Sequence, residues 1–283
     1  MQLGISLAPP RWPAAGGAMA LQTALRAEQL GLHWVTMSDH VLPTTGSGLE
    51  PLTLLAAVAG ATSRIRLASS VLVLPYRHPL LVAGQAATLD VLSGGRFALG
   101  VGTGGDEREF AALGLDVHDR GRRTDAYLAA LRELWSDDAP EPPAARPRTP
   151  GGPPVWVGGR SEAALRRALR FGTGWHGSGV DEQDVRTVRE RLATLGEELD
   201  RDPAELTLSA VCTLVPPGYR PAVPLPLRPL AEPGAGTAQL VDALGRLGAA
   251  GLSMVSLWLP LDPHQLLDAL GWVHTDLLGG LTG

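Results

Sequence analysis

Lysine is absent from this 283-residue sequence, and cysteine occurs once. All 24 residues counted as Lys or Arg are Arg, which excludes a Schiff-base lysine, a phosphate-binding Walker lysine and a lysine general base. The single Cys212 excludes a disulfide framework and a cysteine-based zinc site. Because Cys212 lies within an apolar segment, we expect a buried, unreactive thiol, and its isolation fits a reducing, cytoplasmic location.

Motifs for metal binding and for serine hydrolysis are also missing. The histidines form no HxH or HExxH pattern, which argues against a metal centre; they stand at positions 33, 40, 78, 118, 176, 264 and 274. No GxSxG motif occurs. A net charge of −5 predicts no attraction to nucleic acid or anionic lipid. No apolar run reaches about 18 residues, so we expect no membrane span, and the first residues resemble a strand rather than a signal peptide.

Strand-like and helix-like segments alternate along the chain. Several apolar segments are nearly continuous, which is typical of parallel strands covered on both faces. Eight strand–helix pairs predict a single-domain (β/α)8 TIM barrel over 1–283, since such a barrel takes ~250 residues. A doubly wound open sheet is the alternative if strand six or seven is miscounted. The expected strands are 3–7, 33–38, 65–74, 97–101, 155–157, 174–178, 206–215 and 254–259; the expected helices are 18–30, 51–62, 79–92, 107–113, 123–135, 161–171, 182–199, 237–247 and 263–273.

Two proline-rich segments, 137–154 and 216–236, interrupt this alternation. Their composition favours extended backbone. The segment 137–154 follows a helix, so we interpret it as a surface loop. The segment 216–236 follows the seventh strand, and active sites of barrels lie on the loops at the carboxyl ends of strands. We therefore interpret it as a lid, with a surface loop as the alternative.

The second strand ends in Ser38-Asp39-His40. A carboxylate beside an imidazole at a strand's carboxyl end lies where catalysis in barrels takes place. Histidine titrates near neutral pH, so His40 could donate or accept a proton or a hydrogen bond. The alternative is structural, with Asp39 capping the loop and His40 merely exposed. Sequence position alone favours neither interpretation.

Two glycine-rich turns follow later strands. Gly100-Val101-Gly102-Thr103-Gly104-Gly105 matches GxGxxG, but a dinucleotide-binding domain usually carries this motif in its first βα unit, and here it is in the fourth. Backbone without Cβ still allows a planar or anionic ligand to approach closely. The second turn, 158–162, places Ser161 as the N-cap of a helix, where free N–H groups favour an anion. A tight connection with a capped helix is the alternative.

These residues together resemble a known family, the luciferase-like monooxygenase superfamily, and within it the branch that uses the deazaflavin coenzyme F-420. The resemblance extends from the first strand to about residue 177 and is loose beyond it. It is carried by GLHWVTMSDH at 31–40, the segment 50–104 with its GVGTG ending, EFAALGL at 109–115, RGRRTD at 120–125 and PVWVGGRSEAALRRAL at 154–169.

The resemblance implies a barrel that holds a flavin or deazaflavin at its mouth. It implies a non-prolyl cis peptide at Ser70–Val71, which forms a bulge behind the ring. It also implies that Asp39 and His40 contact the ring, with His40 a proton donor or hydrogen-bond partner, so Asp39 and His40 are the predicted catalytic residues. The implied cofactor-binding residues are Asp39, Ser70, Val71, Thr103, Gly104, Gly158, Gly159, Ser161 and Glu162. Relatives are often dimers, so a homodimer is expected.

The chain departs from the sugar-phosphate dehydrogenases of this branch. Gly105 stands where they carry a catalytic acid after GTG, and the nearby acidic candidates are Asp106 and Glu107. The lysines that hold a substrate phosphate are absent, so a sugar phosphate is not expected, and Gly84 replaces a lysine common in the family. We predict hydride transfer between coenzyme F-420 and a small organic substrate. The alternatives are an FMN-dependent monooxygenase, a non-catalytic cofactor-binding barrel and, least favoured, an NAD enzyme.

Overall fold

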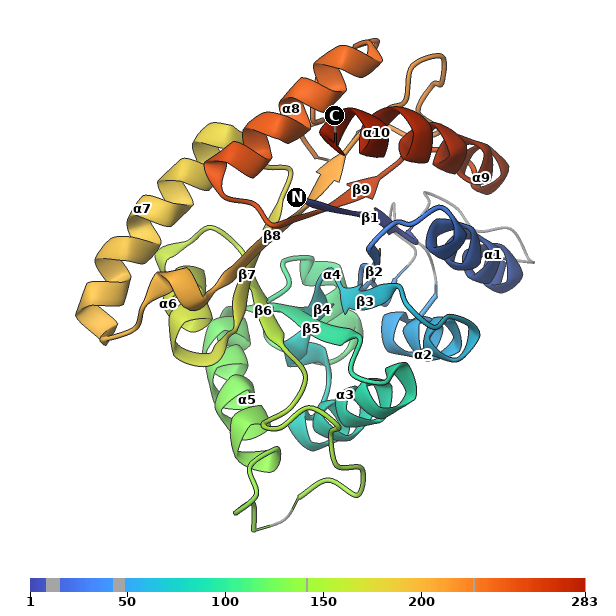
Figure 1. The fold of residues 1–283 in the computed structure, drawn as a ribbon. Coiled ribbons are helices and arrows are strands. Elements are labelled where there is room, and N and C mark those ends of the chain that lie inside the picture. The colour runs from blue at the N-terminus through green and yellow to red at the C-terminus, as the bar shows by residue number, and fades with distance from the viewer. Residues whose placement is uncertain (9–15, 43–48, 141, 226, 283) are drawn as a thin grey trace.

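Parallel strands close into a ring, as the alternation of segments predicts. The computed structural model describes residues 1–8, 16–42, 49–140, 142–225 and 227–282. Within these ranges the strands pair in the order β3-β2-β1-β9-β8-β7-β6-β5-β4, and a β3–β5 pairing completes the ring (Figure 1). The open doubly wound sheet is therefore wrong. The strands are β1 (Gln2–Ser6), β2 (Trp34–Met37), β3 (Arg66–Ser69), β4 (Leu72–Val73), β5 (Phe97–Gly102), β6 (Val155–Gly158), β7 (Gly174–Ser178), β8 (Thr207–Thr213) and β9 (Met254–Trp258).

The predicted third strand is divided into β3 and β4. The peptide bond Ser70–Val71 between them is cis, as the resemblance predicts. The two pieces occupy one position in the ring, since both pair with β5. The strands of the described residues therefore fill the eight positions of a (β/α)8 barrel.

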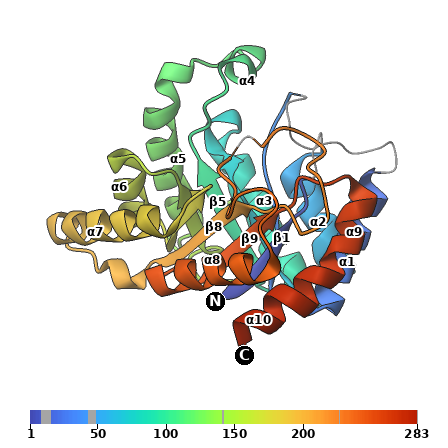
Figure 2. The same cartoon turned by 90° about the horizontal axis from the view of Figure 1, so that it is seen from above.

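Helices surround the ring (Figure 2). Most begin at a side chain that caps them: the Glu50 carboxylate accepts from the Thr53 N–H at 2.7 Å, and Ser161 Oγ accepts from the Ala164 N–H at 3.2 Å. Gly94, at a φ of 67°, ends α3 in the left-handed conformation. The helices are α1 (Gly16–Gln29), α2 (Pro51–Ala61), α3 (Pro79–Ser93), α4 (Glu107–Ala112), α5 (Arg120–Leu134), α6 (Glu162–Phe171), α7 (Glu182–Leu199), α8 (Thr237–Ala250), α9 (Pro263–Trp272) and α10 (Gly279–Thr282).

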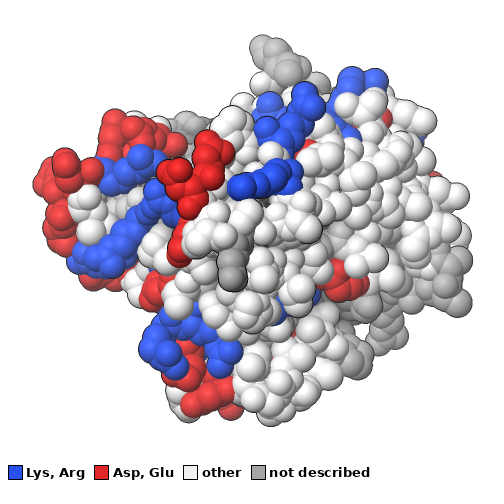
Figure 3. Space-filling model, turned by 90° about the horizontal axis from the view of Figure 1, so that it is seen from below, with Lys and Arg blue, Asp and Glu red and all other residues white. Residues whose placement is uncertain are grey.

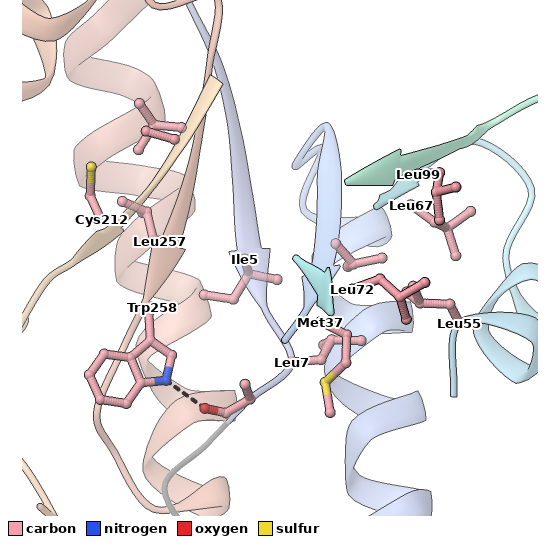
Figure 4. Packing of buried hydrophobic residues seen from close by; sticks show 14 of the residues in the cluster. Ile5, Leu7, Met37, Leu55, Leu67, Leu72, Leu99, Cys212, Leu257 and Trp258 are labelled. Carbon is pink, nitrogen blue, oxygen red and sulfur yellow. Dashed lines mark hydrogen bonds between the residues drawn. The ribbon is translucent and has the colours of Figure 1, made fainter. Parts of the chain in front are cut away.

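Two separate apolar clusters form the core, because successive strand residues alternate between the helices and the lumen. The larger cluster lies between the sheet and the helices and includes Ile5, Leu67 and Leu257 (Figure 4). Cys212 belongs to it and is 1% exposed, so the expected buried thiol is confirmed. The smaller cluster, inside the barrel, consists of Trp34, Ala68, Ala98, Trp156 and Met254.

The proline-rich segments differ in how they attach to the barrel. In the segment 137–154 the Thr149 N–H and Oγ1 both donate to the buried Asp90 carboxylate of α3, at 2.6 and 3.0 Å. The segment 216–236 follows β8, as the lid interpretation requires, and the Leu230 N–H donates to the Thr213 carbonyl at 2.7 Å. Arg228 in this segment pairs with Asp181 and Asp184 at the start of α7. Movement as a lid stays a prediction.

No helix of the described residues combines the length and the apolar character that crossing a membrane requires.

Candidate functional site

The carboxyl ends of the strands meet at one face of the barrel, which we call the mouth. Val71 lies there, packed over glycines of β5 and β6. A Cβ at Gly102 would lie 2.7 Å from Val71 Cγ2, and one at Gly158 would lie 3.3 Å from Val71 Cγ1. A Cβ at Gly100 would lie 2.0 Å from the Ser69 carbonyl oxygen. Gly100 and Gly102 therefore allow close packing against the third strand, and this packing accounts for the lack of a Cβ at both positions.

The end of that glycine turn is more accessible. Thr103 and Gly104 are half-buried, and Gly104 adopts a φ of 72° beside Val73 and Phe110. A Cβ at Gly105 would have no heavy atom within 4 Å. Gly105 is thus the open position of this turn, whereas a Cβ at Gly104 would lie 2.5 Å from Val73 Cγ1. Cofactor binding by Thr103 and Gly104 stays a prediction.

A polar layer crosses the lumen below Val71. Ser70 Oγ lies 2.8 Å from His176 Nε2, and His176 Nδ1 lies 2.9 Å from Ser209 Oγ. The Trp156 ring stacks on His176 at 6.1 Å with an interplanar angle of 13°. Burial lowers the pKa of His176 to about 4. Ser70 is half-buried, whereas His176 and Ser209 are buried, so Ser70 is the member of this layer that reaches the mouth.

Asp39 links the end of β2 to β4 and to Arg77, which follows β4 in the chain. Its Oδ2 accepts from the Val73 N–H at 2.9 Å and from Arg77 Nη1 at 2.5 Å, and its Oδ1 accepts from Arg77 Nη2 at 2.9 Å. Burial lowers the pKa of Arg77, but the hydrogen bonds and charges of Asp39 and Glu50 outweigh it and raise the pKa overall. The Asp39 side chain is only 1% exposed. The structure therefore directs this carboxylate at Arg77 rather than at the mouth.

His40 lies beside a carboxylate that the sequence analysis did not identify. Its Nδ1 is 3.4 Å from Glu109 Oε1, with the two side chains 37% and 2% exposed, respectively. Glu109 Oε1 also accepts from the N–H groups of Val41 and Leu42, at 3.0 and 3.2 Å. The Tyr76 hydroxyl donates to Oε2 at 2.9 Å, and burial followed by this hydrogen bond raises the pKa of Tyr76. Glu109 is thus a buried carboxylate whose oxygens converge on the residues after β2.

The acidic residues named from the sequence face elsewhere. Asp106 caps α4 and pairs with Arg108, whose hydrogen bond lowers the pKa of the Asp106 carboxyl to about 2. Glu107 is exposed. Glu109 and Phe110 are both buried in α4, but their positions in the sequence do not identify His40 as the neighbour of Glu109.

The second glycine turn ends at the start of α6, as predicted. Gly159 has a φ of 112°, and Ser161 caps the helix. Glu162 pairs with Arg166 at 2.9 Å, and Arg160 pairs with Asp184 at 2.9 Å. The first N–H groups of a helix have no carbonyl partner within it, and Ser161 Oγ takes only that of Ala164. This turn can therefore hold an anionic group through its backbone.

Comparison with known proteins extends over most of the chain. The family model described as luciferase-like monooxygenase matches residues 1–216. An F-420-dependent glucose-6-phosphate dehydrogenase of Kribbella flavida is 33% identical over 208 residues, covering 64% of this chain and 62% of the relative. A 4-hydroxyprotoasukamycin monooxygenase of Streptomyces nodosus subsp. asukaensis is 38% identical over 120 residues, covering 42% of this chain and 32% of the relative. The matched part is thus less than two thirds of the length of either relative.

Solved structures share the fold. A monooxygenase from Streptomyces bottropensis superposes with a TM-score of 0.80 at 21% identity and covers 99% of both chains. An F-420-dependent secondary alcohol dehydrogenase in complex with an F-420–acetone adduct gives a TM-score of 0.80 at 17% identity, covering 99% of this chain and 98% of the other. At these identities the similarity establishes the barrel alone.

Proposed function

The chain belongs to the luciferase-like monooxygenase family, and from this premise we propose that it transfers a hydride between coenzyme F-420 and a small organic substrate. The observation that carries the proposal is the pairing of a half-exposed His40 with the buried Glu109 at the mouth. Both an F-420-dependent dehydrogenase and a flavin-type monooxygenase are among the relatives, so the cofactor is the finer part of the proposal.

The residues at the mouth fit a flat ring with an acidic side chain. Val71, supported by Gly102 and Gly158, offers an apolar surface, and His40 Nδ1 is buried without a hydrogen-bond partner among the described residues. We propose that Val71, Thr103 and Gly104 hold the ring. The turn at 158–162, including Gly159, Ser161 and Glu162, would hold the phosphate-bearing side chain through backbone N–H groups. Either cofactor, when bound, supplies the two-electron chemistry.

His40 then moves the proton that accompanies the hydride. Its Nδ1 is buried toward Glu109, so the exposed part of the ring presents Nε2. When an alcohol is oxidised, Nε2 takes the proton of the hydroxyl group while the carbon that bears this group loses a hydride to the oxidised cofactor. In the reverse direction, Nε2 returns the proton to the carbonyl oxygen. The Glu109 carboxylate stabilises the imidazolium that forms.

Asp39 acts through position rather than through direct contact. The bidentate Arg77 pair fixes Asp39, and His40 follows it directly in the chain. A rigid backbone at Asp39 limits where the His40 ring can lie, and orientation of a proton donor contributes substantially to rate. We therefore propose Asp39 and Arg77 as positioning residues for His40.

Two alternative functions are distinguished from hydride transfer with F-420 by the experiments below. An FMN-dependent monooxygenase would use the same mouth, and it is favoured by the monooxygenase relative from Streptomyces nodosus. A barrel that binds cofactor without turnover is favoured by Gly105, which stands where the dehydrogenases carry an acid.

Parallel titrations of the purified protein with F-420 and FMN, followed by cofactor fluorescence, test the cofactor. We expect F-420 to bind more tightly. Tight FMN binding without F-420 binding would overturn that part of the proposal. Bound F-420 with no reaction in either direction, across a panel of alcohols and ketones, would support the non-catalytic barrel.

Substitutions test the roles of the two residues. His40→Ala should lower kcat/KM by about 10²–10⁴-fold, the usual contribution of a general acid or base. Glu109→Gln should lower it by about 10- to 100-fold, since an opposite charge within about 4–6 Å favours the protonated imidazole by about one to two pKa units. Glu107→Gln, an exposed neighbour on the same helix, is the matched control and should leave turnover unchanged. Unchanged turnover in His40→Ala with cofactor bound would remove His40 from the mechanism.

A further inference from the structure

Four groups in the lumen form one continuous hydrogen-bonded chain. It begins at Ser70 Oγ, passes through both ring nitrogens of His176 to Ser209 Oγ, and ends at the Trp175 carbonyl oxygen, 3.1 Å from Ser209 Oγ. The chain crosses the barrel, since Ser70 follows β3 whereas the other three residues lie on β7 and β8.

When all three hydrogen bonds of this chain form together, the direction of each follows from the last member. A carbonyl oxygen only accepts, so the single proton of the Ser209 hydroxyl goes to Trp175. Ser209 Oγ must then accept from His176 Nδ1, which fixes the proton on that nitrogen. In the neutral ring Nε2 is an acceptor, and the Ser70 hydroxyl therefore donates to it.

Burial keeps the His176 ring neutral, so that only one of its two nitrogens carries a proton. His176 is 3% exposed, is stacked against Trp156, and has a pKa lowered to about 4 by burial. The ring is thus neutral across the physiological pH range. The Ser70 hydroxyl donates its only proton to His176, so at the mouth Ser70 Oγ can only accept a hydrogen bond.

We propose that Ser70 Oγ is a specificity-determining acceptor at the mouth, which binds an N–H or O–H group of a ligand and disfavours a group that can only accept. His176 and Ser209 are the positioning residues that set this polarity. The donor has two possible sources, the ring N–H of a flavin-type cofactor or the hydroxyl of an alcohol substrate. This inference rests on the proposed function, because either donor requires that a cofactor or a substrate binds at the mouth.

The polarity itself is tested without ligand or turnover. Nitrogen NMR of histidine-labelled protein at pH 7 should show His176 as the neutral ring protonated at Nδ1. In Ser209→Ala, which removes the acceptor for that proton, the share of the Nε2-protonated form should rise. A wild-type ring protonated at Nε2, or at both nitrogens, overturns the inference whatever the cofactor.

Pairs of small molecules that differ by one N–H or O–H group test which kind of ligand Ser70 Oγ binds. Lumiflavin and 3-methyllumiflavin differ in the ring N–H, and cyclohexanol and cyclohexanone differ in the hydroxyl. We expect the donor-bearing member of one pair to bind about 3- to 10-fold more tightly, which is the net effect of one neutral hydrogen bond. Ser70→Ala should abolish that preference, and the pair affected identifies the source.

Ser69→Ala is the matched control, because the hydroxyl of this adjacent serine donates to the Gly100 carbonyl at 2.7 Å and is fully buried. It should retain the preference. Binding of the probes without any Ser70-dependent preference overturns this inference and leaves the proposed function intact. Failure of all four probes, FMN and F-420 to bind overturns both.

Discussion

Arg77→Met should destabilise the protein far more than loss of a surface ion pair does. Arg77 and Asp39 are 16% and 1% exposed, and their two hydrogen bonds are 2.5 and 2.9 Å long. Methionine fills similar volume but leaves the Asp39 carboxylate buried with the Val73 N–H as its remaining described partner. Removing one member of a buried pair costs about 3–5 kcal/mol because the other charge is left uncompensated.

The structure places the effect at the lower end of that range. The Val73 N–H still satisfies part of the carboxylate, and Glu50, at 42% exposure, contributes little to the pairing with Arg77. We expect a loss of about 3 kcal/mol, equivalent to a fall in Tm of about 5–10 °C for a chain of this size. Asp39→Asn added to Arg77→Met removes the unpaired charge and should recover about half of the loss.

Urea unfolding followed by circular dichroism measures these differences. Arg108→Met is the matched control, since Arg108 is 72% exposed and also pairs with an aspartate, and its loss should leave the midpoint nearly unchanged. A loss below about 1 kcal/mol for Arg77→Met, or a double variant no more stable than the single one, would refute the assignment of Asp39 as a buried, paired carboxylate.

Three further predictions follow from buried or unpartnered groups. Burial lowers the pKa of His176 from 6.5 to about 4, so between these pH values the unfolded chain binds a proton that the folded chain does not. The wild-type free energy of unfolding should therefore fall by about 2 kcal/mol more than that of His176→Gln between pH 7 and pH 5. Urea unfolding at the two pH values measures this difference. Burial raises the pKa of Cys212 to about 12, so a disulfide reagent at pH 8 should label this thiol only after unfolding. The helices α2 and α3 contain one charged residue, the buried Asp90, and Leu81 and Leu92 of α3 are 64% and 53% exposed. We predict that the outer face of these two helices forms a homodimer interface. The double variant Leu81→Arg, Leu92→Arg should then sediment as a monomer.

The surface charge is consistent with that last prediction. Viewed from below, the charged side chains gather mainly on the side where α6 and α7 lie, and much of the remaining face carries few (Figure 3). A monomeric wild-type protein at micromolar concentration would contradict it.

Sequence patterns predicted the barrel because the signals for it are local. A parallel strand covered on both faces is apolar throughout, and glycines such as Gly31 and Gly94 end helices through a positive φ, at 76° and 67°. Each of these signals is contained within one element. Eight such units in series favoured the closed barrel, and the pairing of β3 with β5 then excluded the open sheet.

The candidate site was only partly predictable, because its pairs join distant elements. Three acidic residues follow the glycine turn, and which of them faces His40 depends on how α4 docks against the end of β2. The 3.4 Å approach of Glu109 to His40 spans 69 positions, and the sequence contains no local sign of it. The same holds for Asp39, whose Arg77 partner lies 38 positions away. Composition could identify the residue types but not their partners.

Two sets of polar groups lie behind the mouth, and their opposite electrostatic properties constrain any reaction there. The outer group contains Asp39, Glu109 and Arg77, so a positive charge arising on His40 would be stabilised by the carboxylate 3.4 Å away. The inner group, from Ser70 through His176, is neutral, and burial of its imidazole opposes the formation of charge there. A proton exchanged with a ligand would consequently be taken up at His40 and not at His176. Ser70 can orient a donor but cannot pass its proton inward, because the acceptor behind it would have to become a buried cation.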